Sequence, residues 1–520
     1  MSESDSSIPT APQGAGLVPP EPVIFDQSVP GACAVSLPEL DVEPVERSSV
    51  IPAELLAAEP PRLPEIGELD LVRHYTRLAH RLFSVDGNFY PLGSCTMKYN
   101  PKINERAAAM PGFAHLHPYQ PAGDVQGILE LLYHVRVMLA EIAGLAEVTL
   151  QPAAGAHGEM TGLMIINAYH RSRGEHRPKV LAPDSAHGTN PATCAVCGRH
   201  AVTVASGADG RVDLDDLVKK VDHETAALMI TNPNTVGVFD SSIADIAEIL
   251  HRNGAMLYLD GANMNAILGV ARPGDFGVDV MHYNTHKTFS TPHGCGGPGA
   301  GPVAVAEPLR PFLPTPQVEK LDDGTYALDD DRPAGIGKVR SFFGQVGVLV
   351  RAYAYIRALG PDGLRRVSET AVLSANYLAA RLAGRYKLPF DGPYAHEFIA
   401  VPEFRAAGVT ELDVAKRLID RGFHPPTMSW PVAHCLMIEP TETESLATLD
   451  AFADAMIAIA DEVAADPEKL HQAPLTMPVT RLDEVTAARK PDLRWRPPAA
   501  GVPGNRENRR ESLPTARSRV

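Results

Sequence analysis

The sequence of 520 residues contains 47 Lys and Arg residues against 63 Asp and Glu residues, a formal net charge of -16. This acidic balance argues against a nucleic-acid partner, because phosphate binding depends on clustered basic side chains. No uncharged apolar stretch approaches the length of a membrane span, and the N-terminus lacks the basic and apolar regions of a secretory signal. We therefore expect a cytoplasmic protein without a membrane partner, long enough for several domains.

The first 120 residues are expected to lie outside the main domains. Residues 1–60 are rich in Pro, Ser and Ala near their start and predict a disordered or extended tail. Residues 61–120 predict an N-terminal arm, with helical apolar spacing over 66–83 and a Pro- and Gly-rich loop over 90–101.

Residues 121–340 predict an α/β domain with a mostly parallel sheet. A helix is expected over 124–143, and apolar strands over 180–182, 227–231, 256–259 and 278–283, with a helix over 242–252 between two of them. Each strand ends in a polar cluster, and ligands of such sheets bind beyond the carboxyl ends of the strands. The site is therefore expected at that edge.

Residues 341–485 predict a smaller α+β domain. Helices are expected over 344–359, 363–384 and 445–464, and short strands over 398–401 and 435–438. Residues 486–520 mix Pro, Arg, Asn and Ser and predict a second disordered tail.

Six cysteines are too few for a disulfide framework. Cys194 and Cys197 form a CxxC pair, but a zinc site needs a second ligand pair, which the sequence lacks. A redox role requires the pair at the start of a helix after a strand. We expect a reduced, structural pair and no metal site.

Lys287 and Asp260 are the strongest candidates for chemistry. Lys287 precedes a Gly-rich run over 294–301, and a lysine amine can form a Schiff base with a cofactor aldehyde. Taken alone, a lysine near glycines is explained better by a surface turn. Asp260 ends an apolar strand, where a carboxylate needs a partner such as a protonated pyridine nitrogen; a turn cap before Gly261 is the alternative. Together the two residues favour a pyridoxal-phosphate (PLP) site.

Two further segments fit such a site. Small residues over 151–159 open a helical run, so their amide groups suit a phosphate, although the pattern is neither GxGxxG nor a Walker loop. His187 follows a strand and could stack on the cofactor ring; a hydrogen-bonded loop residue is the alternative.

From about Leu63 to about Arg481 the chain resembles the C-terminal half of the glycine cleavage system P-protein. In many bacteria that half is a separate chain, subunit 2 of the decarboxylating glycine dehydrogenase. The resemblance rests on the segments 89–101, 184–191, 260–266, 285–289 and 439–444. Cys295 stands where the family's Gly-rich run would have another glycine.

The resemblance implies the fold-type-I architecture of PLP-dependent transferases. It implies Lys287 as the Schiff-base lysine, Asp260 as the partner of the ring nitrogen, His187 stacked on the ring, and Asn263 near the phenolic oxygen. It also implies further cofactor contacts from Ala154, Gly155, Ala156, Thr285 and His286. Ser94, Thr96 and Lys98 are expected to line the substrate pocket, with turn formation as their alternative role.

The resemblance further implies decarboxylation of glycine, with transfer of the aminomethyl group to the lipoyl arm of the H-protein. The expected partners are subunit 1 of the P-protein, in an α₂β₂ tetramer, and the lipoylated H-protein. Two alternatives remain: another PLP enzyme of the same fold, such as an aldolase or transaminase, and a non-catalytic partner subunit. Lys287 argues against the second.

Overall fold

The computed structural model describes residues 21–294, 299–477 and 479–496. The chain divides into two compact units, one made of Met1–Leu82 with Thr476–Val520 and the other of Phe83–Leu475. Cys295, residues 1–20 of the expected N-terminal tail and residues 497–520 of the expected C-terminal tail lie outside the described residues.

The first unit is built from short helices joined by extended segments. Phe25 stacks on Trp495 with ring centroids 4.9 Å apart, and Arg77 Nε donates to Glu21 Oε2 over 2.7 Å. The first contact joins residues near the two ends of the chain, and the second joins two residues of the N-terminal segment. Its helices are α1 (Arg47–Val50), α2 (Glu68–Ala79) and α15 (Glu484–Arg489), with 3-10 turns at Ile24–Gln27 and Ala53–Leu55.

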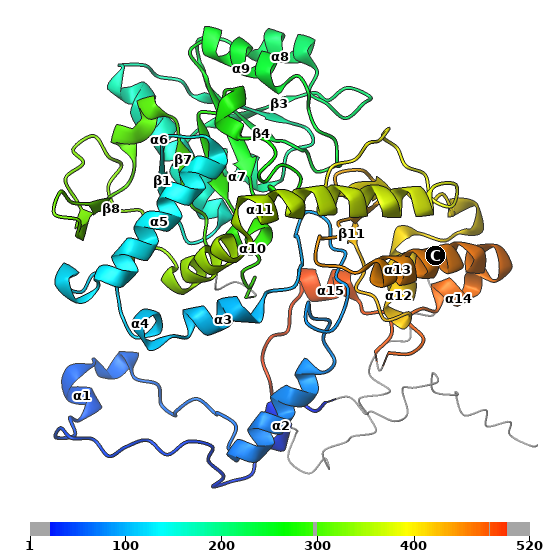
Figure 1. Cartoon of the computed structure of the whole chain (residues 1–520). Helices are drawn as coiled ribbons and strands as arrows, with labels where there is room; N and C mark the ends of the chain where they lie inside the picture. The colour runs from blue at the N-terminus through cyan, green and yellow to red at the C-terminus, as the bar shows by residue number, and fades with distance from the viewer. Residues whose placement is uncertain (1–20, 295–298, 478, 497–520) are drawn as a thin grey trace, which may run out of the picture. The chain divides into compact units, whose positions relative to one another are not determined.

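A seven-stranded sheet organises the second unit (Figure 1). Its strand order is β1-β7-β6-β5-β4-β2-β3, in which β7 runs antiparallel to both neighbours and the other pairs are parallel. The strands are β1 (Glu147–Thr149), β2 (Lys179–Pro183), β3 (His200–Val204), β4 (Thr225–Thr231), β5 (Met256–Gly261), β6 (Val280–Tyr283) and β7 (Val303–Val305). This is the mostly parallel α/β sheet that the sequence predicts.

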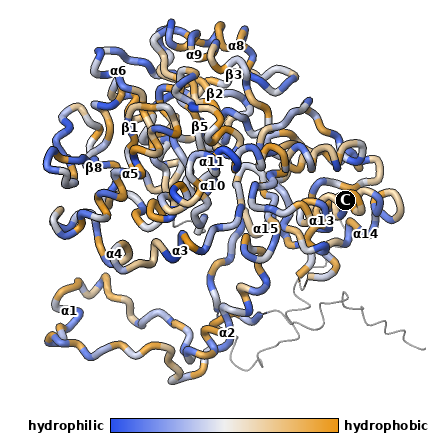
Figure 2. Tube along the Cα trace, viewed as in Figure 1, coloured by the Kyte–Doolittle hydropathy of each residue, from blue (hydrophilic) through white to orange (hydrophobic). Residues whose placement is uncertain are grey.

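Both faces of this sheet are buried, because successive side chains of a strand point to opposite faces. In β5, Leu257 and Leu259 belong to one apolar cluster, and Met256 and Tyr258 belong to another. Figure 2 shows hydrophobic stretches along the central strands. The helices joining or covering the strands are α5 (Gln126–Ala143), α6 (Gly155–Ser172), α7 (Thr189–Val196), α8 (Leu214–Lys220), α9 (Ile243–Arg252) and α10 (Thr285–Thr288).

A three-stranded antiparallel sheet of order β10-β12-β11 forms the core of the C-terminal part. Phe398 and Leu436 of this sheet pack in one apolar cluster with Leu378 and Phe452. Its elements are β10 (Phe398–Ala400), β11 (Thr427–Met428), β12 (Leu436–Ile438), α12 (Glu411–Asp420), α13 (Leu446–Ala465) and α14 (Pro467–His471). The remaining elements of the unit are α3 (Lys102–Ala108), α4 (Pro111–Ala114), a hairpin of β8 (Gln317–Lys320) and β9 (Tyr326–Asp329), and 3-10 turns at Ala122–Asp124, Pro273–Phe276, Glu307–Phe312 and Arg405–Ala407.

The two helices expected over 344–384 form α11 (Val346–Leu382), which is interrupted at Gly360. Gly360 has φ 63° and ψ -178°, and Pro361 follows it, so the helix cannot continue straight through this point. The hydrophobic pattern thus placed the break correctly. It missed β1, β3 and β7: two of them have three residues, and much of β3 is exposed, so none shows the pattern of a long buried strand.

The sequence predicts neither a membrane span nor a reactive cysteine pair. Among the described residues, no helix combines the length and apolar composition that a membrane span requires. Cys194 and Cys197 are free thiols, and they lie at the C-terminal end of α7 rather than at a helix start. Burial raises the pKa of Cys194 to about 12, which makes it a poor nucleophile at neutral pH.

Candidate active site

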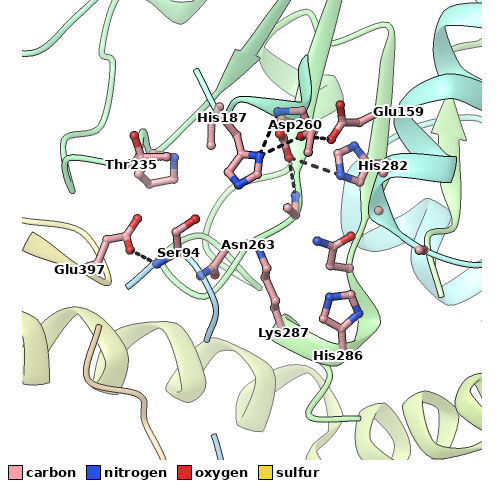
Figure 3. Close-up of a pocket in the computed structure, with 18 of the residues that line it drawn as sticks. Ser94, Glu159, His187, Thr235, Asp260, Asn263, His282, His286, Lys287 and Glu397 are labelled. Carbon is pink, nitrogen blue, oxygen red and sulfur yellow. Dashed lines mark hydrogen bonds and ion pairs between the residues drawn. The ribbon is translucent and has the colours of Figure 1, made fainter. Parts of the chain in front are cut away.

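A cavity of about 250 Å³ opens beyond the carboxyl ends of β4, β5 and β6 (Figure 3). Asp260, the penultimate residue of β5, lines it together with Lys287 of α10. The cavity is also lined by Ser94, Ala154, Gly155, Ala156, His187, Asn263 and His286, so nine of the predicted site residues meet at one place. Thr96, Lys98 and Thr285 lie outside this lining.

Asp260 is a buried carboxylate held by three groups. Asn190 Nδ2 donates to Oδ2 over 3.1 Å, the backbone N–H of Ala262 donates to Oδ1 over 3.1 Å, and His282 Nε2 lies 3.4 Å from Oδ1. Burial alone raises the pKa of Asp260, but the attraction of His282 and Lys287 and these hydrogen bonds outweigh it and lower the pKa below its ordinary value. Asp260 is therefore ionised and can hold a proton on a ligand nitrogen.

Lys287 lies in α10, the single helical turn that follows β6. Thr285, the first residue of this turn, is fully buried, and its backbone N–H donates to the Ala300 carbonyl oxygen over 3.3 Å. This hydrogen bond joins the start of the turn that carries the lysine to the segment at Ala300. His286 lines the cavity, and burial lowers its pKa to about 3, so its ring is neutral.

The N-terminus of α6 forms another part of the cavity wall. Gly155 begins this 18-residue helix, and Ala154 and Ala156 line the cavity beside it. A Cβ added at Gly155 would lie 2.1 Å from Asn284 Oδ1, so only glycine allows this close approach. Unpaired N–H groups of a helix N-terminus suit an anion such as a phosphate.

His187 projects into the cavity near Asp260 (Figure 3). Its Nδ1 lies 2.8 Å from Thr189 Oγ1, and Thr189 Oγ1 donates to Glu159 Oε1 over 2.7 Å. Its ring packs edge-on against Trp430 at 5.4 Å. These contacts hold the ring in one orientation while leaving it at the cavity surface.

Only part of the loop over 90–101, which was expected to line the pocket, reaches the cavity. Ser94 and Thr96 have φ 66° and 53°, a left-handed conformation that is unusual for residues other than glycine. Ser94 lines the cavity, whereas Thr96 is buried against Glu439. Lys98 is also buried, and its Nζ donates to Glu442 Oε1 over 2.7 Å.

The sequence analysis did not identify four glutamate and histidine residues that line the cavity: Glu159, His282, His396 and Glu397. A usable signal was present, because His396 and Glu397 directly precede an apolar strand, as Asp260 ends one. The same argument, that a charged group beside a buried strand needs a partner, applies to both places.

The cavity also contains polar atoms that lack partners among the described residues. Thr231 Oγ1, Asn284 Oδ1 and His286 Nδ1 belong to residues that line the cavity, and they are buried without a hydrogen-bond partner among the described residues. Such atoms are rare in folded proteins unless a ligand or water satisfies them. With a carboxylate, a lysine and a helix N-terminus around one small space, the residues present fit PLP.

The fold and this arrangement define the class as the fold-type-I, PLP-dependent enzymes. The structure resembles a crystal structure of glycine decarboxylase (P-protein) of the glycine cleavage system in inhibitor-bound form, with a TM-score of 0.67 and 23% identity over 79% of this chain and 94% of that one. It also resembles the glutamate decarboxylase of Lactobacillus brevis, with a TM-score of 0.60 and 16% identity over 79% of this chain and 97% of that one.

Sequence comparison narrows the class to one family. The profile of the glycine cleavage system P-protein matches residues 39–323, and that of the glycine dehydrogenase C-terminal domain matches residues 367–476. Probable glycine dehydrogenase (decarboxylating) subunit 2 of Bacillus cytotoxicus is 56% identical, covering 92% of this chain and 98% of that protein. The Halalkalibacterium halodurans protein of that name is 58% identical, covering 91% and 98%. The chain belongs to this subunit 2 family.

Proposed function

We propose that this chain is the PLP-binding, catalytic subunit of a glycine decarboxylase, and that Lys287 holds the cofactor. The observation that carries the proposal is the meeting of an ionised, buried Asp260 and Lys287 in one small cavity. Membership of the subunit 2 family supports glycine as the substrate.

The chain's own residues divide the work of binding. Asp260 would keep a proton on the ring nitrogen, and His282 and Asn190 fix its carboxylate in place. The N-terminus of α6 at Gly155 would hold the phosphate, and His187 would contact the ring. The chemistry that bound PLP supplies is an electron sink for the electron pair left on the substrate carbon when CO₂ departs.

The family also supports the partners. Relatives named subunit 2 imply a subunit 1, and the chain matches 98% of their length. We infer an α₂β₂ assembly with subunit 1 and transfer of the aminomethyl group to the lipoyl arm of the H-protein, in the cytoplasm. The chain alone is then expected to be poorly active.

Release of ¹⁴CO₂ from carboxyl-labelled glycine tests the proposal. The reaction is expected only with PLP, subunit 1 and lipoylated H-protein together, and not with H-protein that lacks its lipoyl group. Lys287→Ala is the matched inactive control. Formation of an oxo acid or of an aldol product, without CO₂, would contradict the proposal and favour a transaminase or an aldolase.

A further inference from the structure

Two glutamates lie side by side in the interior next to the cavity. Glu397 directly precedes β10 and Glu439 directly follows β12, and these strands pair antiparallel with Phe398 opposite Ile438. The register brings both carboxyl groups to the same end of the small sheet. They are 2% and 1% exposed, and their oxygen atoms lie within 4.8 Å of each other. Two carboxylates this close, away from water, cannot both ionise cheaply.

The hydrogen-bond donors around the pair decide which member is charged. Glu439 accepts from the Thr96 backbone N–H over 2.9 Å, from Thr96 Oγ1 over 2.5 Å and from Asn263 Nδ2 over 2.6 Å. Glu397 accepts from the Ser94 backbone N–H over 2.7 Å. Three donors stabilise a carboxylate better than one. Burial raises the pKa of Glu439 as well, but the hydrogen bonds from Thr96 and Asn263 and the charge of Lys287 oppose it. Of the two, Glu439 therefore carries the negative charge and Glu397 the proton.

Other titratable groups around Glu397 do not reverse this assignment. Burial and the charge of Glu439 raise the pKa of Glu397 well above its ordinary value, and Lys287 opposes them only in part. Cys95 faces Glu397 from the Ser94 loop, and burial raises the pKa of its thiol, so it brings no charge. His396 Nε2 lies 3.7 Å from Glu397 Oε1, and burial lowers its pKa to about 3. Both groups are neutral at physiological pH.

The wall formed by these residues faces the cavity without a formal charge. Glu397, His396 and Ser94 all line it, and both ring nitrogens of His396 lack a partner among the described residues. Within the described lining, Lys287 is the one Lys or Arg residue. Apart from Lys287, which would hold the cofactor, this wall offers a substrate carboxylate hydrogen-bond donors but no Lys or Arg side chain.

We propose that Glu397, kept protonated by the neighbouring Glu439, and neutral His396 receive the carboxylate of the substrate through hydrogen bonds. The inference rests on the proposed function and concerns its specificity. A decarboxylase gains from such a wall, because an arginine would stabilise the carboxylate of the bound substrate more than the transition state that leads to neutral CO₂. Gly237 packs directly against the backbone of Glu397, because a Cβ at this position would lie 1.9 Å from the Glu397 carbonyl oxygen.

The protonation of Glu397 can be measured without catalysis. In cofactor-free protein labelled with ¹³C at the glutamate carboxyl carbons, with signals assigned by E397Q and E439Q, the Glu397 signal should stay at its protonated position from about pH 5 to pH 8, above the ordinary glutamate pKa of about 4.3. Glu444, whose pKa burial raises to about 7, should titrate within that range and serves as the internal control. A Glu397 signal that titrates near its ordinary value would overturn the proposal.

Binding to the cofactor-loaded chain with subunit 1 tests the role of that proton. Calorimetry compares glycine with glycinamide, which shares the amine but lacks the carboxylate. E397Q should keep glycine affinity within about threefold, because the amide replaces the donor. Glu397→Ala should weaken glycine binding by about tenfold or more, and neither variant should affect glycinamide.

E439Q tests whether the charge of Glu439 keeps Glu397 protonated. Without the neighbouring charge, Glu397 ionises at lower pH, so the loss of glycine affinity at high pH should shift to lower pH, up to tenfold per pH unit. E444Q is the matched control and should bind as the parent does. An unshifted profile in E439Q, loss of glycine binding in E397Q equal to that in Glu397→Ala, or tight binding of Mn²⁺ or Zn²⁺ by the His396 cluster would overturn the proposal. These binding results stand apart from ¹⁴CO₂ release, whose failure alone would refute only the proposed function.

Discussion

Replacement of Lys98 by methionine distinguishes a structural role from the pocket role expected from the sequence. The Lys98 ammonium is 0% exposed and donates to Glu442 Oε1 over 2.7 Å and to the Thr288 carbonyl oxygen over 3.0 Å. Methionine fills similar space but leaves the Glu442 carboxylate buried, with Tyr355 as its remaining donor among the described residues, over 3.1 Å. Breaking a buried ion pair by removing one partner costs about 3–5 kcal/mol.

The assay is thermal and denaturant unfolding of K98M, E442Q and the double variant K98M/E442Q. K98M should lower the free energy of unfolding by about 3–5 kcal/mol. The double variant should be more stable than K98M, because it contains no uncompensated charge. A K98M protein that unfolds with the parent would refute the reasoning, and if it also failed to bind glycine, Lys98 would belong to the substrate pocket.

Three other variants test the site and the fold. Asp260→Asn should keep its far-UV circular dichroism but lower turnover by about 10²- to 10⁴-fold, since a buried charge partner is worth about 3–5 kcal/mol. Gly155→Ala should weaken PLP binding, measured by equilibrium dialysis, because its Cβ would meet Asn284 Oδ1 at 2.1 Å. Burial raises the pKa of Glu462, but Arg417 and its other cationic neighbours bring it down to about 2 from 4.5. The resulting stabilisation is complete above pH 4.5 and lost as the pH falls toward 2. E462Q should therefore lower the melting temperature at neutral pH and reduce its fall between about pH 4.5 and pH 2. An E462Q protein whose melting temperature falls with acid as steeply as that of the parent would contradict the role of the Glu462 carboxylate.

Much of the sheet and its functional edge follows from local sequence. The strands carrying Asp260 and preceding Lys287 are apolar and end in polar clusters, and parallel strands bring such ends to one edge. That argument needs no knowledge of distant contacts, and it placed both residues at the cavity. The small residues over 151–159 indicated a helix start whose amide groups suit a phosphate, and the resemblance named Gly155 among them; Gly155 lines the cavity.

The parts that local sequence could not place depend on contacts between distant segments. Lys98 and Glu442 are 344 residues apart, and no spacing rule pairs them. Likewise, Glu397 reaches the cavity because the small C-terminal sheet packs beside the Ser94 loop, with 303 residues between the two partners of the hydrogen bond. The position of His396 and Glu397 before an apolar strand could mark them as candidates, but only the folded chain shows that they line this cavity.

The covalent attachment of the cofactor tests the account most directly. The PLP-loaded protein is reduced with borohydride, digested, and its peptides are mapped by mass spectrometry. A single pyridoxyl group on Lys287 is the result expected from the cavity and from Asp260. A pyridoxyl group on another lysine, or none on any peptide, would contradict the assignment of this cavity as the PLP site.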